Sequence, residues 1–197
     1  MKIIGLRCLN SNGKYNQIHK KLRGVVKGNL TIKCHLTSIS SNGIKQYLGK
    51  HSYLRTESKG RIAIGHSLYV SERCIVGAYN GGILHIGDNN FFNVNCNVTC
   101  LKNITIGDNN LFGPNVVIVD HNHKYDDCDR LICRQGFETK SVSIGSDCWI
   151  CANVVITPGS YIGSHIVVAS NAVVTGRLEI PGVYAGIPAK LIKRRGK

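Results

Sequence analysis

The sequence predicts an all-β domain folded as a parallel β-helix, on two observations. Aliphatic residues recur at an unbroken interval of six, and small residues recur in the same register. An α-helix would spread a six-residue repeat around its surface, and an amphipathic strand would alternate with period two, so neither gathers these side chains on one face. In a β-helix each hexad is one short side of a coil, with its aliphatic directed inward. The clearest run is Ile144, Ile150, Ile156, Ile162, Val168 and Val174.

The N-terminal part of the chain is less regular. Residues 1–23 are basic and unpatterned, and we expect a leader that covers the open end of the solenoid, because terminal repeats need capping. The apolar stretch within Met1 to Gly5 is too short for a signal peptide, and no later run approaches a membrane span, so we expect a cytoplasmic protein without stable membrane insertion. Residues 24–178 are assigned to the β-helix. Its first hexad positions are irregular, at Val26, Ile32, Ser38, Ile44, Leu48 and Leu54.

From Ile64 the hexads fall into triplets, and three hexads make one triangular coil. Triplets start at Ile64, Ile86 and Ile106, with a few extra residues between coils, and a much longer insertion over 119–143 precedes the triplet at Ile144. Each set of extra residues follows the third hexad, so the insertions stack on one corner of the prism. A loop of this length in a compact solenoid is usually either functional or disordered.

After Val174 the pattern stops, and we expect Pro181 to end strand pairing. Residues 179–197 form a strongly basic tail, and the net charge of +14 favours attraction to polyanions. One alternative function is therefore a non-enzymatic solenoid that binds a polyanion. Aromatic residues suited to a nucleic-acid platform are few, because Phe92 and Phe112 fit the core, so we expect no nucleic-acid partner.

The nine cysteines are an odd number, which favours reduced thiols over disulfides, and their spacing does not argue for a zinc site. Four of them occupy small or inward positions of the repeat, where a free thiol packs like a small hydrophobe. These are Cys96, Cys100, Cys148 and Cys151.

The long insertion contains the densest cluster of titratable side chains, Asp120-His121-Asn122-His123. Histidine titrates near neutrality and is a natural general base for a hydroxyl or an amine. The same cluster would suit an ordinary polar turn or adventitious metal binding. Its position on the one large insertion of a rigid scaffold favours a catalytic site.

Together with the hexads, three segments resemble the left-handed β-helix acyltransferases, and within them the galactoside, maltose and polysaccharide O-acetyltransferase group. They are 106–116, with its Ile-Gly-Asp-Asn and Gly-Pro-Asn-Val phrases, 144–150, and Ala-Gly-Ile-Pro-Ala-Lys at 185–190. The resemblance covers about residues 60–194. It implies a left-handed prism, transfer of an acetyl group from acetyl-CoA to a hydroxyl of a sugar, nucleotide sugar or surface polysaccharide, and a homotrimer with active sites between adjacent prisms.

The resemblance also implies roles for individual residues. The family's catalytic histidine falls on His123, with His121 as the alternative, and its substrate-orienting asparagine falls on Asn93. A direct transfer needs no covalent enzyme intermediate. The amide of Ala152 would stabilise the thioester oxygen. Trp149 would form a wall of the cleft or pack at a coil corner. Expected coenzyme contacts are Ser170 and Thr175 at the pantetheine end and Lys190 and Lys193 at the phosphates.

The acceptor and the reaction class have alternatives. The galactoside branch has acidic residues where this chain has 99–102, so we expect a different acceptor, and the loop is more similar to that of enzymes acting on bacterial surface sugars.

A γ-class carbonic anhydrase shares the prism and binds zinc through three histidines. His85 and His121 are two nominal coils apart, but the third ligand position holds Asp126. We therefore expect no metal requirement.

Overall fold

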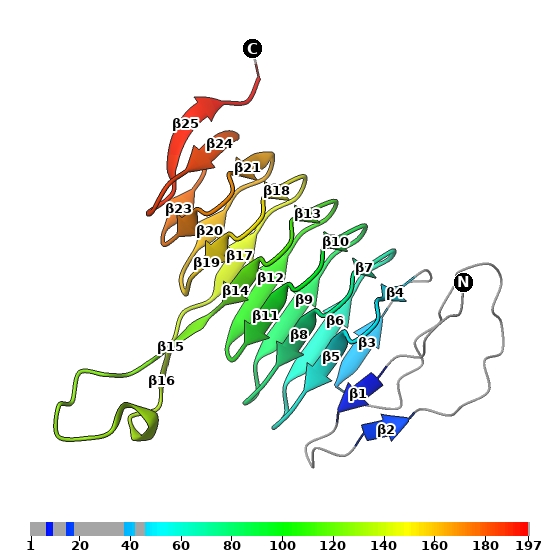
Figure 1. Cartoon of the computed structure of the whole chain (residues 1–197), viewed down its shortest axis with the longest axis vertical. Coiled ribbons are helices and arrows are strands. Elements are labelled where there is room, and N and C mark those ends of the chain that lie inside the picture. The colour runs from blue at the N-terminus through cyan, green and yellow to red at the C-terminus, as the bar shows by residue number, and fades with distance from the viewer. Residues whose placement is uncertain (1–6, 10–14, 18–37, 42–45, 197) are drawn as a thin grey trace.

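The computed structural model describes residues 7–9, 15–17, 38–41 and 46–196. In these residues the chain forms a left-handed parallel β-helix, as predicted, with three sheets that run the length of a triangular prism (Figure 1). No helix among the described residues is long and apolar enough to cross a membrane.

Strands of each sheet stack one coil above another. Sheet A contains β1 (Arg7–Leu9), β2 (Tyr15–Gln17), β5 (Tyr53–Thr56), β8 (Ile75–Ala78), β11 (Asn97–Cys100), β14 (Val117–Val119), β19 (Val155–Ile156) and β22 (Val173–Val174). Sheet B contains β3 (Ile39–Ser41), β6 (Arg61–Ile64), β9 (Ile83–Ile86), β12 (Asn103–Ile106), β17 (Val142–Ile144), β20 (Tyr161–Ile162) and β23 (Arg177–Leu178). Sheet C contains β4 (Tyr47–Leu48), β7 (Tyr69–Val70), β10 (Phe91–Phe92), β13 (Leu111–Phe112), β18 (Trp149–Ile150), β21 (Ile166–Val168), β24 (Gly182–Ala185) and β25 (Lys190–Arg194).

The hexad aliphatics form the core, as the repeat predicts. Ile64, Ile86, Ile106 and Ile144 follow one another in register on sheet B, and all are buried. On sheet C, Phe92 and Phe112 stack with ring centroids 4.3 Å apart. Because the inward position repeats once per coil, each buried side chain packs on its equivalents above and below.

Removal of one of these stacked rings should therefore be costly. Phe112→Ala is expected to lower the free energy of unfolding by about 3–5 kcal/mol, because it leaves a cavity against Phe92 that rigid neighbouring coils cannot fill. Leu111→Ala is the control, since Leu111 points outward and is 52% exposed, and it should change stability by no more than about 0.5 kcal/mol. Denaturant unfolding monitored by circular dichroism measures both, and equal costs would contradict the inward and outward assignment.

Three kinds of corner connect the sheets, because the chain runs from sheet B to C to A and back to B. The glycine corner, after sheet B, contains Gly65, Gly87, Gly107, Gly145 and Gly163. The asparagine corner, after sheet C, contains Asn95, Asn115, Asn153 and Asn171. The hairpin corner, after sheet A, contains 79–82, 101–102, 120–141, 157–160 and 175–176.

The asparagines are held by their side chains as well as by the turns. All four have φ near +60°, a conformation that asparagine tolerates better than most residues. Their amides form a ladder along the prism, with Nδ2 to Oδ1 distances of 3.1, 2.9 and 3.0 Å between successive coils. The ladder fixes the vertical alignment of this corner.

The early register and the C-terminal end differ from the sequence predictions. β3 pairs Ser41 with Ile64, so Ser41 and not Ser38 occupies the inward position of that coil. Leu48 and Leu54 pair with Val70 and Val76, as the hexads require. Val26, Ile32 and Ile44 lie outside the described residues.

Pro181 does not end the sheet, because Gly182 in β24 pairs directly with Ile166 of β21. Tyr184 of β24 is buried at the next inward position, and β25 folds back antiparallel on β24. At the other end, β1 pairs in parallel with β5. The domain boundaries at 23/24 and 178/179 stay predictions. Strands β1 and β2, which precede the first boundary, and β24 and β25, which follow the second, continue the sheets of the prism.

Candidate active site

The long insertion forms an antiparallel hairpin that projects from the prism (Figure 1). β15 (His121–His123) pairs with β16 (Phe137–Thr139), and a short 3-10 helix, η1 (Ile132–Arg134), lies in the loop between them. The Phe137 ring contacts both histidines, with centroids 5.5 Å from His121 and 4.5 Å from His123. Both imidazoles therefore lie on the same side of the hairpin.

A buried carboxylate attaches the hairpin to the prism. Asp120 is fully buried, and its Oδ1 accepts a hydrogen bond from the amide of Leu101 at 2.8 Å. Its Oδ2 accepts from the amides of Lys102 and Asn103 at 2.7 and 2.9 Å. Leu101 and Lys102 form the connection of the coil before and Asn103 begins β12, so the base of the hairpin is tied to the hairpin corner below it.

The two histidines have different surroundings. The His121 side chain is 16% exposed, and its Nδ1 lies 3.3 Å from Oδ1 of Asp120. His123 is exposed and packs on Phe137. His121 is thus oriented by a carboxylate, whereas His123 is open to a bound molecule.

A glutamine organises the loop between β15 and β16. The Gln135 amide nitrogen donates to the carbonyls of Asp127 and Arg130 at 2.8 and 2.9 Å, and its oxygen accepts from the amide of Asp127 at 3.1 Å. The sequence has no pattern that predicts this closure. The residue type at Gln135 is the only indication of this closure that the loop sequence contains. A side-chain amide can both donate and accept hydrogen bonds, as the backbone of a neighbouring strand does.

Ala152 lies at the asparagine corner with its amide uncovered. Among the hydrogen bonds of the described residues, its carbonyl accepts from Asn171 but its N–H donates to none. Gly113 lies on the neighbouring coil, and a Cβ there would be 2.7 Å from the Ala152 nitrogen. The absence of a side chain at Gly113 therefore leaves the amide accessible to an oxygen atom of a bound molecule.

Two further predicted residues lie near this corner. Trp149 points outward from sheet C between Leu111 and Val167, and it is 54% exposed. Asn93 is partly buried at the asparagine corner, where its Oδ1 accepts from the amide of Val94 at 2.8 Å. The exposed face of Trp149 can form an apolar wall of a binding cleft. The hydrogen bond that Oδ1 of Asn93 accepts fixes the direction in which the amide nitrogen of the same side chain points.

The structure divides the predicted site residues between the two ends of the sheet A strands. The hairpin corner holds His121, His123 and Thr175. The other end holds Asn93, Ala152 and Ser170 at the asparagine corner, with Trp149, Lys190 and Lys193 on sheet C. A prism side of about five residues spans about 16 Å, so one chain does not bring the two groups together.

The lysines lie on an ordered strand. Lys190 and Lys193 are exposed on β25, paired with Ala185 and Val183. The amide of Ala189 donates to the carbonyl of Val173 at 2.8 Å, and the Arg195 guanidinium lies 3.0 Å from the Asp147 carboxylate. The basic segment is thus held against the last coil, which fixes the strand from which the two lysines project.

Burial disfavours the thiolate form of three cysteines near these corners. Burial raises the pKa of Cys100 to about 12, and the Asp120 carboxylate adds to the effect. Burial also raises the pKa of Cys148 and of Cys151. Cys96, Cys100 and Cys148 are buried, as predicted, whereas Cys151 is partly exposed. Because the thiolate is the nucleophile, these positions do not favour a covalent cysteine intermediate.

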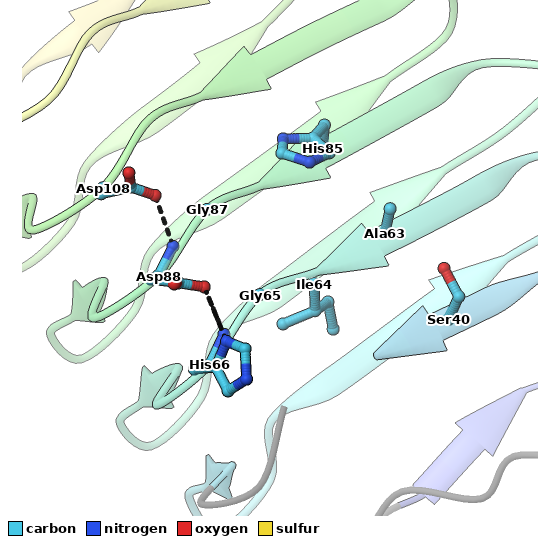
Figure 2. A pocket seen from close by; sticks show the side chains of 9 residues that line it. All are labelled: Ser40, Ala63, Ile64, Gly65, His66, His85, Gly87, Asp88 and Asp108. Atoms are coloured by element: carbon cyan, nitrogen blue, oxygen red, sulfur yellow. Dashed lines mark hydrogen bonds and ion pairs between the residues drawn. The ribbon is translucent and has the colours of Figure 1, made fainter. Parts of the chain in front are cut away.

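A separate hollow of about 230 Å³ lies where sheet B meets the glycine corner (Figure 2). It is lined by His66, His85, Asp88 and Asp108, among others. The Asp88 carboxylate accepts from the amide of His66 at 2.6 Å, and Asp108 accepts from the amide of Asp88 at 2.7 Å. Both carboxylates thus serve the stacking of coils.

The two histidines of the zinc alternative lie on different elements of the chain. His85 lines the hollow on sheet B, whereas His121 lies on the hairpin. Within 7–9, 15–17, 38–41 and 46–196, no three histidine, cysteine or acidic side chains form a group that could hold a metal.

The fold and the site have the features of an acyltransferase built on hexapeptide repeats, and comparisons with known proteins agree. The family model described as bacterial transferase hexapeptide, six repeats, matches residues 141–176. The chain is 31% identical over 149 residues to the putative lipopolysaccharide biosynthesis O-acetyl transferase WbbJ of Escherichia coli K12, which covers 72% of this chain and 75% of WbbJ. It is 34% identical over 115 residues to the galactoside O-acetyltransferase of the same organism, which covers 57% of this chain and 55% of that enzyme.

Among solved structures, a variant of the N-acyltransferase AntD from Bacillus cereus has the same fold. The TM-score is 0.66 at 18% identity, with 81% of this chain and 84% of AntD covered. The chain therefore belongs to the left-handed β-helix acyltransferases of the hexapeptide-repeat family, and it is an enzyme of that class. The resemblance expected from the sequence motifs is confirmed.

Proposed function

We propose that this enzyme transfers an acetyl group from acetyl-CoA to a hydroxyl of a sugar, either in a nucleotide sugar or in a surface polysaccharide. The names of the two Escherichia coli relatives support the acetyl group and the sugar. AntD was crystallised with a dTDP-sugar and coenzyme A. The observation that carries the proposal is the pairing of two features, the histidine hairpin at one corner and the uncovered Ala152 amide at the other.

The active site would lie between two copies of the chain. His123 and the Ala152 amide are at opposite ends of the sheet A strands, so a cleft that contains both needs the hairpin corner of one copy and the asparagine corner of the next. A closed ring of three prisms repeats this cleft three times. The homotrimer expected from the family therefore fits the separation of the residues within one chain.

The chemistry follows from the two corners. His123, as neutral imidazole, takes the proton from the acceptor hydroxyl while that oxygen attacks the thioester carbonyl carbon. The carbon–oxygen bond forms, and the negative charge that develops on the carbonyl oxygen is stabilised by the Ala152 amide. The carbon–sulfur bond then breaks, and the leaving thiolate of CoA takes the proton from the imidazolium. His121 is the alternative base.

The remaining residues would hold the donor. Ser170 lies one coil beyond Ala152 at the asparagine corner, and Thr175 lies beyond the hairpin at the hairpin corner, so the pantetheine arm can run between the two copies. Lys190 and Lys193 then neutralise the phosphates at the far end. Trp149 forms the apolar wall beside the thioester. Asn93 orients the acceptor from the same corner.

A panel of acceptors tests the proposal. Release of CoA from acetyl-CoA is measured with nucleotide sugars, free sugars and acidic and neutral polysaccharides, and the acetylated product is identified by mass spectrometry. We expect release above the rate without acceptor only for sugar hydroxyls. CoA binding without transfer to any acceptor would contradict the sugar, and stoichiometric zinc required for activity would favour the carbonic anhydrase alternative.

A further inference from the structure

We propose that Asp120 is a positioning residue that fixes the tautomer of His121, with the proton on Nδ1 and a lone pair on Nε2. This inference rests on the proposed function in one respect, namely that the hairpin carries the catalytic histidine. Asp120 combines two properties that no other acidic residue of the described chain has. It is completely buried, and it contacts both a histidine and three backbone amides.

The donors around the carboxylate determine what His121 can do. An ionised carboxylate only accepts hydrogen bonds, and burial without donors would be costly. Three amides and the Cys100 thiol, at 3.4 Å from Oδ2, supply these donors. An Nδ1 lone pair of His121 would face the negative Oδ1 at 3.3 Å and repel it. Nδ1 therefore carries the proton, and the second ring nitrogen is left as an acceptor.

The same carboxylate sets the position of the hairpin. The amides of Leu101, Lys102 and Asn103 belong to the coil that precedes the insertion, so Asp120 connects the base of β15 to a rigid layer of the prism. His121 follows Asp120 directly, and His123 lies on the same side of β15 against Phe137. A substitution at Asp120 should therefore affect both histidines. It changes the tautomer of His121 and the position of His123.

Asp120→Asn separates the tautomer from the fold. The Asn amide has one acceptor and one donor side, and it can satisfy the Lys102 and Asn103 amides only by turning its oxygen toward them. Its NH2 then faces the Leu101 amide and Nδ1 of His121. In this orientation the side chain loses the hydrogen bond from the Leu101 amide. In the opposite orientation it loses the two hydrogen bonds from the Lys102 and Asn103 amides. His121 must then accept at Nδ1, so its proton moves to Nε2.

Histidine nitrogen NMR on the full chain, labelled with 15N-histidine, measures this directly. At a pH where imidazole is neutral, we expect His121 of the wild-type protein to be the Nδ1–H tautomer and that of Asp120→Asn to be the Nε2–H tautomer. Signals are assigned with His121→Asn. We also expect kcat of Asp120→Asn to fall by at least about tenfold with KM for acetyl-CoA unchanged, rising toward about 10⁴-fold if His121 itself is the base, as in hydrolases with a wrong tautomer.

Asp108→Asn is the matched control, because the Asp108 carboxylate also accepts an amide of a neighbouring coil but lies at the glycine corner. It should change neither the His121 signal nor kcat. An Nε2–H tautomer in the wild-type protein, which needs no variant, would overturn the proposal, and so would an unchanged tautomer or full activity in folded Asp120→Asn. Full activity of both His121→Ala and His123→Ala would instead refute the proposed histidine mechanism and leave the tautomer result standing.

Discussion

His123→Ala is expected to lower kcat by about 10² to 10⁴-fold and to leave KM for acetyl-CoA within about twofold. The variant removes the group that takes the proton from the acceptor. His123 is exposed on the hairpin and packs only its ring against Phe137, so the fold should not depend on it. Steady-state kinetics with the best sugar acceptor, together with acetyl-CoA binding by calorimetry, measure the two parts of this expectation.

Two neighbouring positions serve as controls for the histidine. Asn122 lies between the histidines on β15, opposite Glu138, and is exposed, so Asn122→Ala should keep kcat within about twofold. His121→Ala should lose less activity than His123→Ala, because the role proposed for His121 is to accept a hydrogen bond at Nε2 and to hold the hairpin in place. If His121→Ala is inactive while His123→Ala retains its rate, the base is His121 and the assignment of His123 is wrong.

Ala152→Pro is expected to lower kcat by about 10² to 10³-fold without loss of the fold, because it deletes the one N–H that would stabilise the oxyanion. The equivalent position one coil earlier is already Pro114, and the surrounding bonds repeat, since Asn153 donates to the Pro114 carbonyl and Asn171 to the Ala152 carbonyl. Proline is common at the second position of such turns. The space that Gly113 leaves at the Ala152 nitrogen can hold the proline ring.

Ala152→Ser is the companion variant, since it adds a hydroxyl but keeps the amide. It should retain activity within a few-fold, and both variants should unfold at the denaturant concentration of the wild-type protein within error. If Ala152→Pro is folded and fully active, the Ala152 amide does not stabilise the oxyanion.

Much of the fold follows from periodicity, because a hexad repeat has one inward position per side of a coil. Ile64, Ile106 and Ile144 could therefore be assigned to the core before their contacts were known, and insertions could be assigned to one corner. The register of the first coil could not be predicted, since Ser41 is polar at an inward position. The strand after Pro181 was also missed, because proline at the start of a strand interrupts no bond.

The candidate site was only partly predictable. The motif identified His121 and His123, but the role of Asp120 depends on amides of Leu101 to Asn103, which lie about twenty residues away in sequence and one coil away in space. Gly113 lies within a family motif that assigns it no role, although its missing side chain uncovers the Ala152 amide. Contacts between coils depend on insertion lengths, so sequence separation does not reveal them.

The central proposal, that His123 of one copy and the Ala152 amide of another form each active site, is tested most directly by mixing two inactive variants. His123→Ala and Ala152→Pro are co-expressed with different tags, and trimers that carry both tags are isolated. In every trimer that carries both tags, whatever its ratio of the two variants, about one of the three clefts receives both intact corners. The proposal predicts recovery of about a third of the wild-type kcat, and activity of the mixed trimers no higher than that of either variant alone would contradict it.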